Sequence, residues 1–175
     1  PVARVTNVDK LTYAGNPANL ADIAGDPRYH FVHLDIADLR LRAVLRENPP
    51  DAIINVAAET HVDRAIADPL VFARTDVLGT QNLLECAREI GVRRFVQVST
   101  DEVYGSISEG AATEDSPLQP GNPYSASKAG GDLLCLSYAN TYGLAVSVCR
   151  GANTYGPHQY PEKFIPLFAT NAIDG

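Results

Sequence analysis

Tyr124 and Lys128 are residues whose types and spacing suggest a chemical reaction. They stand four apart in "YSASK", where a helix is expected to begin, so their side chains lie on one face of that helix. An ammonium favours a nearby phenolate, so we predict that Lys128 lowers the pKa of Tyr124 and makes it a base for an alcohol proton. Such pairs also occur on solvated helices. Their place one segment after a strand ending in Ser and Thr favours a catalytic role.

Asp101 and Glu102 are adjacent carboxylates that directly follow the apolar run "RRFVQVST". A capping box or an exposed turn would also use acidic residues here. Removing a hydride from a carbinol needs only one base, whereas elimination beside a new ketone needs a base for the C–H and an acid for the departing hydroxide. We therefore interpret the two carboxylates as that second acid–base pair, with Ser99 or Thr100 bonding the same substrate oxygen as Tyr124.

Alternating apolar runs and helical stripes predict the elements that position these residues. Strands are expected at 2–9, 29–35, 52–58, 92–99 and 144–150, and helices at 17–25, 39–48, 69–90, 123–142 and from Pro161 onward. This alternation is typical of right-handed βαβ units on a parallel sheet, an α/β fold whose ligands sit at the carboxyl ends of the strands.

The sequence also predicts where two of these helices begin or end and which residues one of them buries. Asp38 is expected to cap helix 39–48, and Gly91 is expected to follow the end of helix 69–90. The apolar stripe of the longer helix is expected to consist of Leu70, Ala73, Val77, Leu84 and Ala87.

Composition narrows the class of protein. The 175 residues carry a formal net charge of −7, which argues against a nucleic-acid or anionic-membrane partner. No apolar run approaches the roughly 18 residues of a membrane span. The three cysteines are scattered, which favours a reducing, cytoplasmic location over a disulfide framework. The sequence has no methionine and begins with a strand-like run, so we expect an internal fragment of a longer protein.

Asp9 ends the first expected strand, where an acidic residue of a dinucleotide fold accepts hydrogen bonds from ribose hydroxyls. A loop aspartate that caps a turn is the alternative, because no glycine-rich turn precedes Asp9. We therefore expect the first strand and the phosphate-binding loop to lie outside this sequence. His30 and His33 would point to opposite faces of a strand, and no metal site is expected.

Five segments together resemble the dTDP-glucose 4,6-dehydratases, a family of extended short-chain dehydrogenases/reductases. The segments are "NVDKLTYAGNPANL", "AAETHVDRAI", "STDEVYG", "NPYSASKAGGD" and "RGANTYGPHQYPEKFIPLF", and the resemblance covers essentially the whole sequence. It implies a Rossmann-type doubly wound parallel sheet that forms part of an NAD-binding domain over 1–175, with the substrate-binding part starting at about 151. The long helices 69–90 and 123–142 would pair in a homodimer.

The resemblance also implies the roles of individual residues. Catalysis would depend on Thr100, Asp101, Glu102, Tyr124 and Lys128. NAD would be bound by Asp9, Lys10, Leu11, Thr12, Asp35, Ile36, Val56, Ala57, Ala58, Glu59, Thr60, Thr75, Tyr124 and Lys128. The substrate, dTDP-glucose, would be bound by Thr60, Thr100, Asn153, Lys163 and Phe164.

The implied reaction is dehydration to a 4-keto-6-deoxy sugar by transient hydride transfer to NAD. Sugar-nucleotide epimerases and decarboxylases are alternatives within the same superfamily. A non-catalytic dinucleotide-binding module is an alternative of another class.

Overall fold

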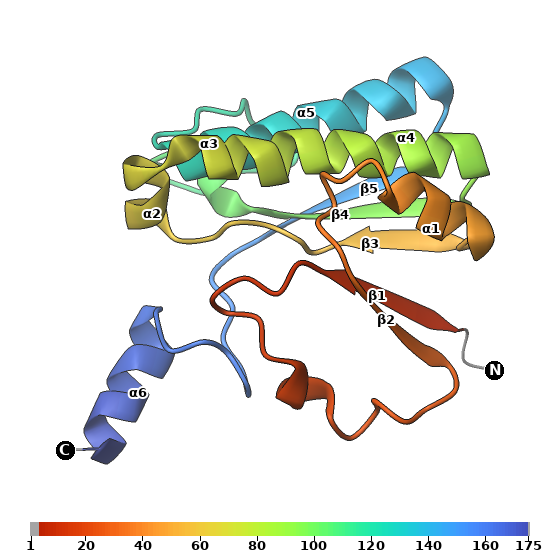
Figure 1. The fold of residues 1–175 in the computed structure, drawn as a ribbon. Helices are drawn as coiled ribbons and strands as arrows, with labels where there is room; N and C mark the ends of the chain where they lie inside the picture. The colour runs from red at the N-terminus through yellow and green to blue at the C-terminus, as the bar shows by residue number, and fades with distance from the viewer. Residues whose placement is uncertain (1–3, 175) are drawn as a thin grey trace. The chain divides into compact units, whose positions relative to one another are not determined.

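A computed structural model describes residues 4–174. The chain divides into two compact units, which are described separately: one comprises Pro1–His33 and Asn153–Gly175, and the other comprises Leu34–Ala152. Figure 1 shows the elements of both units. All the paired strands among the described residues run parallel, which confirms the predicted parallel α/β class.

The first unit contains a two-stranded sheet and a terminal helix. Its elements are β1 (Val5–Asp9), the 3₁₀ helix η1 (Pro17–Leu20), β2 (Tyr29–His33) and α6 (Phe164–Asp174). The helix expected at 17–25 is therefore a short 3₁₀ turn, and the helix expected from Pro161 starts at Phe164. Residues 2 and 3 of the first expected strand lie outside the described residues.

The second unit is a three-stranded parallel sheet in the order β3–β4–β5 with helices packed on it. Its elements are α1 (Leu41–Glu47), β3 (Ala52–Asn55), α2 (Val62–Ala67), α3 (Pro69–Phe72), the π-helix η2 (Ala73–Gly79), α4 (Thr80–Ile90), β4 (Arg94–Thr100), the 3₁₀ helix η3 (Asp101–Tyr104), α5 (Pro123–Tyr142) and β5 (Val146–Gly151). Helices α4 and α5 run side by side over one face of the sheet (Figure 1).

The ends of the helices follow local signals. Helix α5 begins with a capping box between Asn122 and Ser125, with Pro123 at its first position, and this start was predicted. Gly91 ends α4 in the left-handed region at φ 76°, also as predicted. The predicted cap of α1 is wrong, because the carboxylate of Asp38 accepts the N–H of Arg40 in a preceding turn and Arg40 itself is the N-cap residue.

The predicted apolar stripe of residues 69–90 is wrong in its first half, where Leu70 is 78% exposed. The cause is η2, whose wider π turn rotates Thr75, Asp76 and Gly79 into the interior in place of the predicted residues. The second half of the stripe keeps the α-helical phase, and Leu84 is fully buried there. The insertion of a π segment places a charged side chain next to α5.

Candidate active site

The carboxyl end of β4 forms the base of the candidate active site. Thr100 is the N-cap residue of η3, and its Oγ1 accepts the backbone N–H of Glu102 at 3.2 Å. The same hydroxyl donates to Oδ1 of Asp101 at 3.3 Å. The predicted Thr–Asp–Glu triplet is thus a single hydrogen-bonded turn, because a strand that ends in threonine caps the short helix after it.

The start of α5 lies against this turn. Asn122, the N-cap residue of α5, donates from Nδ2 to Oε2 of Glu102 at 3.4 Å. The two elements that hold the predicted acid–base groups are therefore joined at their first residues. Asn122 was not among the predicted site residues, although a cap asparagine just before "PYSASK" is visible in the sequence.

Tyr124 is buried, with 8% of its surface exposed, and packs with Phe72 and Ala65. Burial raises its pKa to about 12; a hydrogen bond with Thr100 opposes this rise, and the charges of Glu102, Asp76 and Asp101 add to it. The structure thereby brings Tyr124 together with the triplet. The prediction that Lys128 lowers the pKa of Tyr124 is wrong for this structure, because burial and nearby carboxylates dominate.

Lys128 lies on the same buried face of α5 as Tyr124 and is 4% exposed. Its Nζ donates to the backbone carbonyl of Val98 at 2.8 Å, which holds the ammonium against the C-terminal part of strand β4. Burial lowers the pKa of Lys128, and the carboxylates of Asp76 and Asp132 oppose this effect. The shared face predicted from the four-residue spacing is confirmed.

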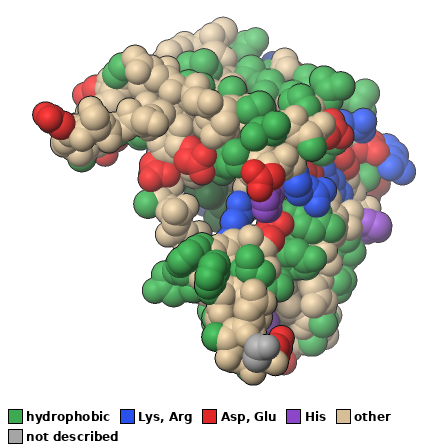
Figure 2. Space-filling model, turned by 90° about the vertical axis from the view of Figure 1, so that its left-hand side faces the viewer, with side chains coloured by type: hydrophobic (Ala, Val, Ile, Leu, Met, Phe, Trp, Pro, Cys, Tyr) green, Lys and Arg blue, Asp and Glu red, His purple; other side chains and the backbone are tan. Residues whose placement is uncertain are grey.

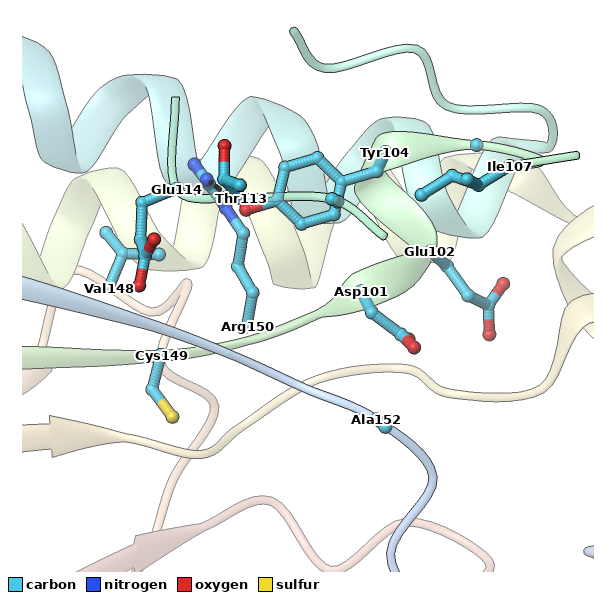
Figure 3. Close-up of a pocket in the computed structure, with 12 residues that line it drawn as sticks. Asp101, Glu102, Tyr104, Ile107, Thr113, Glu114, Val148, Cys149, Arg150 and Ala152 are labelled. Atoms are coloured by element: carbon cyan, nitrogen blue, oxygen red, sulfur yellow. Dashed lines mark hydrogen bonds between the residues drawn. The ribbon is translucent and has the colours of Figure 1, made fainter. Parts of the chain in front are cut away.

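A pocket of about 750 Å³ opens beside the triplet and is lined in part by Asp101, Glu102, Tyr104 and Arg150. Figure 3 shows that Tyr104 points away from the two carboxylates and toward Arg150. Nη1 of Arg150 donates to the Tyr104 hydroxyl at 2.9 Å, and its Nε donates to Asp132 at 2.9 Å. Sequence analysis missed this link, because the three residues are distant in sequence and no local motif unites them.

The predicted cofactor residues of the second unit, apart from Tyr124 and Lys128, lie in three places. Glu59 and Thr75 are buried near the cluster, since the backbone N–H of Glu59 donates to Asp76 at 3.3 Å and Thr75 precedes Asp76 in η2. Asp35 and Ile36 lie at a different place, next to η2 and α4: the side chain of Ile36 faces Gly79, and its carbonyl accepts from Asn82 at 2.8 Å. The remaining residues of this unit, Val56, Ala57, Ala58 and Thr60, line the loop after β3.

The other predicted binding residues belong to the first unit. Asp9 ends β1 with an exposed carboxylate whose Oδ1 accepts the N–H of Leu11 at 2.7 Å. Leu11 has a left-handed backbone with φ 50°, so the chain turns sharply after the strand. Lys10 and Thr12 belong to the same turn. Of the predicted substrate residues, Asn153, Lys163 and Phe164 are in the C-terminal part of this unit, whereas Thr60 and Thr100 belong to the second unit.

The face of the molecule seen in Figure 2 has no single chemical character. On the face seen in Figure 2, basic side chains are interspersed with acidic and hydrophobic ones. Among residues 4–174, no helix is both long and apolar enough to cross a membrane. Within the same range, no cluster of three or more His, Cys, Asp or Glu side chains could hold a metal ion.

The sequence matches the family model described as GDP-mannose 4,6 dehydratase over residues 1–175. It is 55% identical over its full length to a dTDP-glucose 4,6-dehydratase of Streptomyces griseus and covers 53% of that protein. The chain thus spans about half the length of the curated relatives it matches.

Solved structures of nucleotide-sugar dehydratases and epimerases are similar to this chain. A dTDP-glucose 4,6-dehydratase of Streptomyces venezuelae, DesIV, solved with NAD bound, superposes with a TM-score of 0.95 at 58% identity, over 100% of this chain and 54% of that one. A UDP-glucose 4-epimerase of Thermus thermophilus, solved with NAD, superposes with a TM-score of 0.84 at 32% identity, over 95% of this chain and 53% of that one.

Proposed function

The chain belongs to the GDP-mannose 4,6-dehydratase family, and from this premise we propose that the complete protein is an NAD-dependent dehydratase that acts on dTDP-glucose. The observation that carries the proposal is the cluster of Tyr124 with Asp101 and Glu102 around Thr100. An oxidation alone would need one base, and the two further carboxylates supply the acid and base of an elimination. The substrate is proposed from the likeness to dTDP-glucose 4,6-dehydratases.

The residues at the end of β4 fit the nicotinamide end of NAD. Ser99 Oγ is buried and has no hydrogen-bond partner among the described residues, so a polar ligand group would complete the site. Tyr124 and Lys128 add a phenol and an ammonium on the adjacent face of α5. When bound, NAD supplies a hydride acceptor at the sugar C4 and a hydride donor at C6, and its cationic ring favours the phenolate. In the first unit, the exposed carboxylate of Asp9 fits the adenosine ribose hydroxyls.

The side chains then divide the proton transfers between them. Tyr124 takes the proton of the C4 hydroxyl as the alcohol is oxidised. The new ketone acidifies the C5 proton, which Glu102 removes, and Asp101 protonates the C6 hydroxyl as it leaves as water. When C6 is then reduced, Glu102 gives a proton back to C5. Thr100 forms hydrogen bonds both within the turn that holds the carboxylates and with the Tyr124 hydroxyl. It therefore fixes the position of Tyr124, the base of the oxidation, relative to the carboxylates of the elimination.

Separate replacement of the two carboxylates tests this division. Asp101→Asn and Glu102→Gln are nearly isosteric, so we expect oxidation at C4 to persist while NADH accumulates on the enzyme and turnover falls about 10²-fold or more. Glu102→Gln should also suppress deuterium exchange from solvent at C5. The measurements are stopped-flow NADH absorbance and mass spectrometry of the recovered sugar. Glu109→Gln, in the exposed loop, is the matched control.

Two results would contradict the proposal. Parental turnover in both variants would make the carboxylates structural. A loss of turnover without NADH formation would assign them to binding or oxidation, and an epimerase reaction on a nucleotide sugar would then be the better assignment.

The domain organisation, the cellular location and the oligomeric state of the enzyme are proposed from the same structure. We propose that residues 1–175 form part of the NAD-binding domain and that the substrate-binding part starts at about 151, close to the end of the second unit at Ala152. The three cysteine thiols are free, which supports a reducing cytoplasm. Leu78 and Leu133 are each 57% exposed, on η2 and α5 respectively, which supports a homodimer formed by these helices.

A further inference from the structure

Asp76 is a buried carboxyl beside the catalytic cluster that the proposed mechanism leaves without a role. Its surface is only 1% exposed. Oδ2 accepts a hydrogen bond from Ser127 Oγ at 2.7 Å, and Oδ1 accepts the backbone N–H of Glu59 at 3.3 Å. Ser127 also donates to the carbonyl of Tyr124 at 2.8 Å, so Asp76 connects the loop after β3 to the first turn of α5.

The packing around Asp76 brings η2 unusually close to α5. A Cβ added to Gly131 would lie 2.9 Å from the backbone oxygen of Asp76, and one added to Gly130 would lie 3.0 Å from the side chain of Val77. Gly131 therefore permits a close approach to the backbone of η2 that a Cβ would disturb, and Gly130 lies against the Val77 side chain. Because the π turn of η2 rotates Asp76 into this contact, the carboxyl group is held in place by both its hydrogen bonds and the backbone around it.

The charges of Lys128 on α5 and of Glu59 in the loop after β3 act on this carboxyl, and its own charge raises the pKa of Tyr124. Burial raises the pKa of Asp76 to about 6; the Ser127 hydrogen bond, the Lys128 charge and the Glu59 N–H oppose the rise, and the Glu59 carboxylate adds to it. Above pH 6 the group is thus ionised. Its charge then opposes the effect of burial on the pKa of Lys128.

We propose that Asp76 is a positioning residue that keeps the buried Lys128 ammonium charged and fixes the first turn of α5 beneath Tyr124. This inference rests on the proposed function in one respect: the proposed function makes Lys128 the partner of the base Tyr124. A buried ammonium with one backbone acceptor depends on nearby negative charge to remain protonated. Asp76 supplies such a charge from η2, in addition to Asp132 of α5 itself and independently of Asp101 and Glu102.

Asp76→Asn tests the charge while keeping the contacts. The amide oxygen can accept the Glu59 N–H, and the amide NH₂ can donate to Ser127 Oγ, whose proton still reaches the Tyr124 carbonyl. The matched control is Ser127→Ala, which removes the hydrogen bond and leaves the carboxylate. In the complete protein with ¹³Cε-labelled lysine, we expect the Lys128 resonance to titrate at lower pH in Asp76→Asn than in Ser127→Ala or the parent.

The pH dependence of unfolding gives a second readout that needs no substrate. A folded-state pKa of about 6, above the ordinary value of 3.8, contributes stability at low pH that is lost as the pH rises through 6. Between pH 4.5 and 7.5 the unfolding constant of the parent should therefore rise about 20-fold relative to that of Asp76→Asn. The ratio should level off above about pH 7, where Asp76 is ionised in the folded protein; a ratio that keeps rising about tenfold per pH unit up to pH 9 would show that Asp76 stays neutral and would overturn the inference.

The kinetic readout links the charge to the reaction. The alkaline limb of NADH formation should move to lower pH in Asp76→Asn and stay in place in Ser127→Ala. An unmoved Lys128 titration in Asp76→Asn would overturn the inference whatever the substrate. If the Lys128 titration moves in Asp76→Asn but the parent does not convert dTDP-glucose, the proposed function alone is overturned.

Discussion

Replacement of Arg150 should destabilise the protein because Arg150 joins the elements that hold the acid–base groups. Its Nε donates to Oδ2 of Asp132 on α5 at 2.9 Å, and its Nη1 donates to the Tyr104 hydroxyl of η3 at 2.9 Å. The guanidinium carbon also lies 5.2 Å from the centre of the Tyr104 ring. Arg150→Met keeps an unbranched side chain in the same space but removes all three interactions.

The expected magnitude follows from the burial of the partner. The Asp132 side chain is 0% exposed and that of Arg150 is 14% exposed, so the pair is largely shielded from water. Oδ1 of Asp132 already lacks a hydrogen-bond partner among the described residues. Removing one member of a buried pair costs about 3–5 kcal/mol, and the slight exposure of Arg150 places the loss of unfolding free energy at about 3 kcal/mol.

A double-mutant cycle separates the ion pair from simple packing. Asp132→Leu together with Arg150→Met removes both charges of this pair, so neither is left buried without its partner, and we expect the double variant to be more stable than Arg150→Met alone. The assay is urea unfolding at pH 7, followed by circular dichroism, on the parent, both single variants and the double variant. The reasoning is refuted if Arg150→Met costs less than about 1 kcal/mol, or if the losses of the two single variants simply add.

Two further predictions concern the base and the helix contact. Tyr124→Phe keeps the aromatic ring, whose centre lies 6.3 Å from that of Phe72, but removes the ionisable oxygen. Single-turnover NADH formation should therefore fall about 10²–10⁴-fold, and unchanged formation would assign the base elsewhere. Gly131→Ala should lower the unfolding free energy by about 1–3 kcal/mol, because its Cβ would lie 2.9 Å from the oxygen of Asp76. Gly121→Ala, in open space, is the matched control and should change the unfolding midpoint little.

Local features of the site could be predicted from the sequence because they depend on spacing along one element. A four-residue interval places Tyr124 and Lys128 on one helical face, and the structure confirms this. The triplet after β4 was found because parallel strands present their carboxyl ends to ligands. The start of α5 was predicted at Pro123, since proline is tolerated at the first position of a helix, and the structure confirms it.

The tertiary structure decided the rest, since burial and charge depend on residues far away in sequence. The π turn of η2 has no periodic pattern in the sequence, so the burial of Asp76 in place of the predicted apolar residues could not be foreseen. Glycines of α5, about 50 residues later in the chain, make room for this turn. The pKa of Tyr124 lies near 12 because its surroundings exclude water and include three carboxylates, whereas the sequence had suggested a lower value from one nearby lysine. Sequence spacing thus determined which groups lie together on each element, and packing between elements determined their protonation, because the energy of a charge depends on everything around it in space.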